Sequence, residues 1–226
     1  MIKNTNIIYS NNHSKFLDKI IKSKRLEMVK IINDQIKQFE IKDALDIGTT
    51  LDLENESSNL IIKSLENIKN FKCISDQEIE SSFFIKKLKK SITENFSKEE
   101  IEEFSSDLVI SNATIEHVGS FSQQQKMVNN IINFSKKLFI IITPNRYHPI
   151  DFHTKIPLIH WLPKSIHRKI LNILRMPFYA KEENLNLLDV NEIKKLLSFN
   201  DVTYKINSIK LLFFKSNFII IGEKNR

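Results

Sequence analysis

Residues 44–50 read Ala-Leu-Asp-Ile-Gly-Thr-Thr (ALDIGTT), and this stretch decides the fold class. It contains a short apolar run, Ala44, Leu45 and Ile47, which ends in a polar loop. Such a run is typical of a buried parallel strand followed by a turn. The chain has only three glycines, so we expect Gly48 to mark a backbone position that a side chain would obstruct.

On both sides of this stretch, helical and strand-like segments alternate. Amphipathic spacing predicts a helix over 14–40, before the strand. Further helices are predicted at 57–67 (capped by Ser57 or Ser58), 77–90, 122–135, 164–174 and 189–198. Further strands are predicted at 71–75, 91–93, 107–111, 137–143, 206–214 and 217–224, the last two joined by a tight turn at Lys215-Ser216. This order predicts a Rossmann-like, doubly wound, mostly parallel sheet of seven strands that ends in an antiparallel hairpin.

The composition is that of one globular domain over residues 1–226, because 41% of the side chains are hydrophobic. We expect an N-terminal helical extension at about 1–40 and an inserted substrate-side or lid segment at about 144–187. Cys73 is the single cysteine, which excludes an internal disulfide. No stretch approaches the roughly 20 apolar residues of a membrane span, and the N-terminus lacks a signal-peptide core. These features predict a cytoplasmic protein.

The net charge of +7 comes from lysines spread over many segments. It is compatible with an anionic partner such as nucleic acid, an acidic glycan or a membrane surface, and equally with a lysine-rich compositional bias.

Two acids lie where predicted strands end. Asp46 belongs to the first strand's exit, and Asp76 follows the second strand. A carboxylate at the second exit can accept both hydroxyls of a ribose, because it offers two oxygens to vicinal donors. The alternative for Asp76 is a helix N-cap.

Three stretches in order, ALDIGTT at 44–50, DLVISNATIEHVG at 107–119 and FIIITPNR at 139–146, resemble the class I S-adenosylmethionine-dependent methyltransferases, in particular the methyltransferase type 11-like domains. The closing hairpin also matches that family. In the first loop, Thr50 and Asp52 stand where the family usually has glycines.

The resemblance implies S-adenosylmethionine as cofactor. Asp46 and Gly48 would contact its methionine part and Asp76 its ribose, with the adenine near Thr93 and Glu94. The fourth strand's exit would pass close to the sulfonium. The implied cofactor-binding residues all lie at strand exits: Asp46, Gly48, Thr49, Asp76, Thr93, Ser111, Asn112 and Ala113.

Glu116 and His117 follow the fourth strand, and three interpretations compete. His117 is a candidate catalytic base, because its unperturbed pKa lies near neutrality. The pair can also ligate a divalent metal, as in related methyltransferases with an E-x-x-E-H pattern, but Ala113 stands at the first Glu position. Alternatively, the pair bonds backbone groups and only holds its loop.

The segment 143–163 follows the fifth strand directly, so it starts at the same edge of the sheet. Asp151 and His153 are candidate catalytic residues, a base with its orienting partner. The predicted substrate-binding residues are Glu116, Arg146, Tyr147, His148, His160 and Trp161. The structural alternatives are that Asp151 caps a turn, that His153 is a loop histidine whose hydrogen bonds are satisfied, and that Trp161 covers the core. No Cys or acid spacing accompanies the histidines at 153, 160 and 167, so no metal site is predicted.

The sequence supports three functional hypotheses. The first is methyl transfer to an unidentified small-molecule or lipid- or glycan-linked acceptor. For a lipid-linked acceptor, the basic amphipathic helix at 164–174 would be a lid or a peripheral membrane contact, although an ordinary docked helix explains it as well. The second is a non-catalytic binding module or partner subunit of the same fold. A nucleic-acid methyltransferase, the third, is disfavoured because no base-flipping motif follows the fourth strand.

Overall fold

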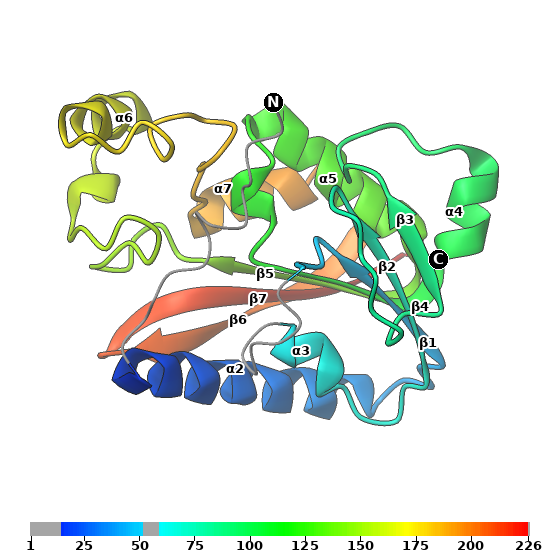
Figure 1. Ribbon diagram of the computed structural model, residues 1–226. Helices are drawn as coiled ribbons and strands as arrows, with labels where there is room; N and C mark the ends of the chain where they lie inside the picture. The colour runs from blue at the N-terminus through cyan, green and yellow to red at the C-terminus, as the bar shows by residue number, and fades with distance from the viewer. Residues whose placement is uncertain (1–14, 52–58, 226) are drawn as a thin grey trace.

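The protein folds around one mixed sheet (Figure 1). The computed structural model describes residues 15–51 and 59–225. Within those two ranges, seven strands lie in the order β3-β2-β1-β4-β5-β7-β6. Their bounds are Asp43–Ile47 (β1), Asn70–Ser75 (β2), Lys86–Lys89 (β3), Ser106–Asn112 (β4), Ser135–Pro144 (β5), Val202–Leu211 (β6) and Phe214–Lys224 (β7).

The strand directions match the predicted doubly wound sheet. Strands β1 to β5 are parallel, and β7 lies between β5 and β6, antiparallel to both. The chain winds from β1 outward to β3, then returns to the other side of β1 to form β4. The strand order therefore reverses between β1 and β4, and in open α/β sheets ligands bind beyond the strand ends at such a point.

Helices cover both faces of the sheet (Figure 1). Helices α2 and α3 pack on one face, and α4, α5 and α7 lie on the other. The bounds are Lys15–Ile36 (α2), Leu60–Lys63 (α3), Lys98–Phe104 (α4), Phe121–Phe134 (α5), Lys164–Ile173 (α6) and Val190–Leu197 (α7). Because side chains alternate along a strand, neighbouring residues serve opposite cores: Ile140 packs toward α2, and Ile141 toward α5.

The predicted helix at 77–90 and strand at 91–93 are wrong. Residues 77–85 contain no helix, and the third strand is Lys86–Lys89, which pairs in parallel with 72–75. The strand lies at the edge of the sheet and its lysines are mostly solvent-exposed. Charged, Lys-rich edge strands resist further strand pairing, and the same composition imitates a solvated helix in sequence.

Helix α4 was not predicted. Its start carries a capping box: Ser97 Oγ accepts a hydrogen bond from Glu100 N, and the Glu100 side chain accepts one from Ser97 N. The S-x-x-E pattern was therefore available in the sequence. The helix buries only Phe104 fully, so its hydrophobic periodicity is weak.

The closing hairpin is confirmed, but its predicted turn is shifted. The chain turns at Leu212-Phe213, whose φ angles are 49° and 70°, instead of at Lys215-Ser216. Two successive positive φ angles characterise a type I′ hairpin turn, which usually shows itself through Asn and Gly. Here apolar residues occupy it, so the turn looked like part of a strand.

The N-terminal prediction of a helix is confirmed for Lys15–Ile36, where Met28, Ile32 and Ile36 join the core. Of the predicted helix at 57–67, helix α3 covers Leu60–Lys63, and the proposed caps Ser57 and Ser58 lie outside the described residues. Among residues 15–51 and 59–225, no helix combines the length and the apolar character that crossing a bilayer requires.

Candidate active site

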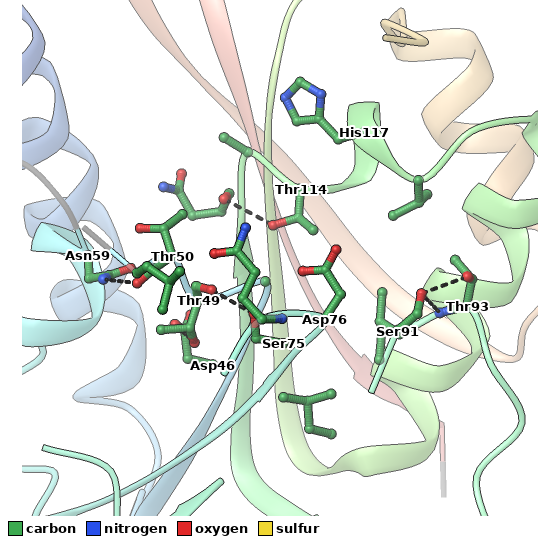
Figure 2. A pocket seen from close by; sticks show the side chains of 18 of the residues that line it. Asp46, Thr49, Thr50, Asn59, Ser75, Asp76, Ser91, Thr93, Thr114 and His117 are labelled. Atoms are coloured by element: carbon green, nitrogen blue, oxygen red, sulfur yellow. Dashed lines mark hydrogen bonds between the residues drawn. The ribbon is translucent and has the colours of Figure 1, made fainter. Parts of the chain in front are cut away.

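A cavity of about 900 Å³ lies at the carboxyl ends of β1, β2, β3 and β4 (Figure 2). Its walls come from the loops that follow these four strands, from Arg25 of α2 and two residues of α3, and from residues 145–187, which we call the post-β5 segment. The cavity thus occupies the position expected from the reversal of strand order between β1 and β4.

Gly48, in the β1 loop, is required by close packing. Its φ angle is +84°, and a Cβ atom there would lie 2.2 Å from Thr114 Oγ1. Its N–H donates to the carbonyl of Ile74, 2.9 Å away, which ties the loop to β2. The sequence predicted a close approach of this backbone to a ligand. In the structure Gly48 does line the cavity, but the contact that excludes a side chain is made by Thr114, after β4.

Asp46 lies near the end of β1 and lines the cavity although it is only 6% exposed. Burial raises the pKa of its carboxyl to about 6, and the Thr49 hydroxyl, which donates to Oδ2 at 2.5 Å, opposes that rise. Next to it, burial and the Asp46 charge raise the pKa of the Cys73 thiol to about 12. The carboxylate therefore lies in a poorly solvated position that favours a cationic partner.

Asp76 follows β2 and is exposed on the cavity wall. The turn at this exit is bonded through Ser75, whose Oγ donates to the Thr49 carbonyl (2.8 Å) and accepts from Gln77 N (3.2 Å). The alternative of Asp76 as a helix N-cap is wrong, because no helix follows it. Its two carboxylate oxygens face the cavity (Figure 2).

The exits of β3 and β4 complete this wall. Thr93 lines the cavity from the loop after β3, where its Oγ1 lies 2.9 Å from Ser91 Oγ. Asn112, the last residue of β4, and Ala113, which follows it, also line the cavity. Ser111 instead is buried, and its Oγ donates to the Ile47 carbonyl at 2.9 Å. Its side chain joins β4 to β1 and is not directed into the cavity, contrary to the predicted cofactor contact.

Four titratable residues meet at the opposite side of the cavity. Glu116 and His117 lie on a 3-10 turn, Ile115–His117. His117 Nε2 lies 3.2 Å from His153 Nε2, and His153 Nδ1 lies 3.1 Å from Asp151 Oδ1. Both imidazoles line the cavity, whereas the Asp151 and Glu116 carboxyls are buried behind them. The predicted catalytic trio of His117, Asp151 and His153 is therefore one cluster.

Burial and charge shift the pKa values in this cluster in opposite directions. Burial lowers the pKa of His117 to about 3 and raises the pKa of Glu116. Burial also acts on His153 and Asp151: it lowers the pKa of the imidazole and raises the pKa of the carboxyl. Even so, the hydrogen bond and charge of Asp151, together with the Glu116 charge, raise the pKa of His153, and the same bond holds the pKa of Asp151 below its usual range.

The predicted substrate contacts Arg146, His148 and His160 are turned into the post-β5 segment. The Arg146 guanidinium donates to the carbonyls of His160 (3.1 Å) and Leu162 (2.8 Å). His160 Nε2 lies 2.7 Å from the His148 carbonyl, and His148 Nδ1 bonds within its own turn. All three side chains are buried. Their hydrogen bonds stabilise the fold of this segment, and none of the three side chains lines the cavity.

Three further predicted substrate contacts also lie away from the cavity wall. Tyr147 and Trp161 are 47% and 42% exposed and pack edge to face, with ring centroids 6.4 Å apart. Glu116 is wholly buried, and its Oε2 accepts from Thr143 Oγ1 at 3.2 Å. The alternative that Glu116 and His117 bond backbone groups holds for His117, whose Nδ1 lies 2.7 Å from the Asn184 carbonyl, whereas the Glu116 carboxylate accepts from the Thr143 side chain.

Several cavity-lining residues were missed. Phe152, Phe178 and Tyr179 form an aromatic part of the wall beside His153, and Asn184 adds a polar group. The only sequence signal was their position in the stretch after the fifth predicted strand. They reach the cavity because the post-β5 segment folds back over the ends of the strands.

No protein-family model matches this sequence, and no curated protein matches it. Solved structures do. The magnesium protoporphyrin IX methyltransferase ChlM from Synechocystis PCC 6803, with bound SAM, superposes with a TM-score of 0.57 at 11% identity, covering 96% of this chain and 88% of that one. The N-methyltransferase NodS from Bradyrhizobium japonicum WM9, in complex with S-adenosyl-L-homocysteine, gives 0.58 at 9% identity and covers 98% and 96%.

The small RNA methyltransferase HEN1 matches with a TM-score of 0.55 at 13% identity, over 88% of this chain but only 25% of that one. At such identities the likeness concerns the fold. The chain has the fold of the class I S-adenosylmethionine-dependent methyltransferases, as the ordered strand exits predicted.

Proposed function

We propose that this chain binds S-adenosylmethionine in the 900 Å³ cavity and transfers its methyl group to a small-molecule acceptor or one linked to a lipid or glycan. The observation that supports this most is the pair of acids at the ends of adjacent strands, Asp46 and Asp76, which border a cavity at the reversal of strand order. The volume lies near the top of the roughly 300–1,000 Å³ range of ligand pockets, which suits a cofactor together with part of an acceptor.

The carboxyl of Asp46 fits the amino end of such a cofactor. It is buried, its pKa is raised to about 6 by that burial, and it is therefore largely ionised at neutral pH in a poorly solvated position. An ammonium group would offset the cost of that buried charge. The Thr49 hydroxyl donates to Oδ2, and we expect the ligand's ammonium group to donate to Oδ1.

The exposed carboxylate of Asp76 fits a ribose, because two oxygens can accept from two vicinal hydroxyls. Thr93, from the β3 exit, is then the neighbour of the adenine, and Asn112 and Ala113 from β4 are neighbours of the sulfur. Bound there, the cofactor supplies a methyl group on a positively charged sulfur for transfer to an acceptor atom.

The acceptor would lie on the side of the cavity bounded by His117, His153 and the aromatic residues of the post-β5 segment. Phe152, Phe178 and Tyr179 offer apolar surface to the acceptor's body, and the two imidazoles face its reacting group. Placing acceptor and methyl donor in contact accounts for much of the rate enhancement in such bimolecular reactions.

Binding of S-adenosylhomocysteine, measured by titration calorimetry, tests this proposal. We expect one site per chain. Asp46→Asn and Asp76→Asn should each weaken binding by about ten- to a hundredfold, since a hydrogen bond to a charged group contributes roughly 1.5–3 kcal/mol.

The matched control is Glu78→Gln. Glu78 lies two residues beyond Asp76, is exposed and pairs with Lys89 on the outside of the sheet, so its loss should leave affinity unchanged. Absence of binding at millimolar ligand in the parent chain would overturn the proposal. Equal losses in all three variants would instead overturn the assigned contacts.

A further inference from the structure

Three potential ligand atoms of Glu116, His117 and His153 converge beside the cavity. One carboxylate oxygen and one nitrogen from each imidazole all lie within 4.8 Å of one another. The carboxylate and one imidazole come from the turn after β4, and the other imidazole comes from the post-β5 segment, 36 residues further along. We call these three residues the EHH cluster.

Each imidazole of the EHH cluster is held through its Nδ1 atom. His117 Nδ1 lies 2.7 Å from the Asn184 carbonyl, and His153 Nδ1 lies 3.1 Å from Asp151 Oδ1. A carbonyl and a carboxylate only accept hydrogen bonds, so both Nδ1 atoms carry the proton. The lone pairs of both neutral rings are then on Nε2. A carboxylate or a carbonyl behind Nδ1 is also the usual support of a metal-binding histidine.

The two Nε2 atoms face each other at 3.2 Å. Two lone pairs at that distance repel each other unless a proton or a cation lies between them. Ligand atoms that share a metal at bond lengths near 2.1 Å are separated by roughly 3.0 to 3.4 Å. The observed distance therefore suits two imidazole ligands of a single ion.

Glu116 supplies the second, independent observation. Its side chain is fully buried, and Oε1 accepts no hydrogen bond within the described part of the chain, although Oε2 accepts from Thr143. Oε1 lies 4.0 Å from His117 Nε2, on the side where the two imidazoles meet. A buried carboxylate oxygen without a donor is costly unless a positive charge faces it.

We propose that Glu116, His117 and His153 bind one divalent transition-metal ion through Oε1 and the two Nε2 atoms. Two imidazoles and one carboxylate on one side of an ion suit zinc, cobalt, manganese or iron(II) and leave further positions open. Those positions face the cavity, because both histidines line it. An oxygen of water or of the acceptor can occupy them. The ion would also neutralise the buried Glu116.

The competing occupant is a single proton shared between the two Nε2 atoms. It would relieve the repulsion between the lone pairs but would leave Glu116 Oε1 without a donor. A titration of the full-length, metal-stripped chain with Co²⁺ and Zn²⁺ separates the two, followed by calorimetry and by the visible absorption of bound Co²⁺. We expect one ion per chain and a Co²⁺ spectrum of low coordination number. Neither cofactor nor acceptor is needed.

His117→Ala and His153→Ala should each weaken binding by about a hundredfold or more. Asp151→Asn, which keeps all three ligands but removes the carboxylate behind His153 Nδ1, should weaken it by about ten- to a hundredfold. Each variant with one histidine replaced keeps five of the six histidines, and the matched control His167→Ala keeps both ligands. Glu116→Gln preserves shape and tests the charge. Circular dichroism melting of every variant separates lost binding from lost folding.

Absence of one-to-one binding up to millimolar Co²⁺ and Zn²⁺ in the folded parent chain would overturn the proposal. So would full affinity in folded His117→Ala and His153→Ala chains. Binding of S-adenosylhomocysteine is measured separately, so failure of the metal site and failure of the proposed methyl transfer give different results.

Discussion

The loops that follow β1 to β4 and the post-β5 segment both border the cavity, but they use their polar residues in opposite ways. Asp46, near the end of β1, and Asp76 and Thr93, in the loops after β2 and β3, line the cavity. In the post-β5 segment, Arg146 and His160 are bonded to the segment's own carbonyls. A segment rich in His, Arg and Trp therefore uses most of its polar groups to hold its own fold, and only a few residues reach the site.

The largest expected effect concerns the strand-exit loops. Gly48→Ala should lower the free energy of unfolding by about 2–4 kcal/mol, because it combines a positive φ angle with a Cβ placed against Thr114. Urea unfolding measures it. The double variant Gly48→Ala/Thr114→Ala should recover part of the loss. If Gly48→Ala alone is as stable as the parent, the packing described for this loop is wrong.

Next in size, Arg146→Ala should cost about 2 kcal/mol of stability, because it removes two charge-assisted hydrogen bonds to carbonyls and leaves buried acceptors. Affinity for S-adenosylhomocysteine should stay within about threefold of the parent value, since the guanidinium faces away from the cavity. Urea unfolding and calorimetry measure the two. A large loss of affinity without a loss of stability would mean that Arg146 contacts the ligand, and the two regions would then not differ in the way described.

A smaller effect concerns pH. The pKa of Asp46 is raised to about 6, so the carboxyl is ionised at pH 7.5 and mostly protonated at pH 5. A bound ammonium favours the ionised form, so the affinity for S-adenosylhomocysteine should fall by about tenfold between pH 7.5 and pH 5. Calorimetry at several pH values measures it. The matched control, Asp46→Asn, should bind weakly with a flat profile over this range, and the same slope in that variant would assign the titration to another group.

The smallest expected change separates Ser111 from its neighbours Asn112 and Ala113. Ser111→Ala should lower the free energy of unfolding by about 1 kcal/mol through loss of the buried bond to the Ile47 carbonyl. Affinity for S-adenosylhomocysteine should not change. If affinity falls by more than about fivefold while stability holds, Ser111 is a cofactor contact after all, as its place in the sequence predicted.

The sequence was sufficient to predict the elements whose hydrophobic pattern reflects how they are buried. Strands β1, β2, β4 and β5 are short apolar runs, because both of their faces are covered. It was insufficient for β3, an exposed edge strand of lysines, and for the Leu212-Phe213 turn, where apolar residues adopt positive φ angles. In both places local composition and final conformation disagree.

The same division holds for the site. The positions of Asp46, Gly48 and Asp76 followed from the sequence alone, because the carboxyl ends of parallel strands meet at one edge of the sheet. The meeting of Glu116, His117 and His153 did not, and Ala113, at the first Glu position of the E-x-x-E-H pattern, argued against a metal at Glu116 and His117. That cluster depends on how the post-β5 segment folds back, which is fixed by buried bonds of Arg146 and Asp151. The sequence determined which strand ends place acids at the cavity, and tertiary packing decided which distant side chains lie beside it.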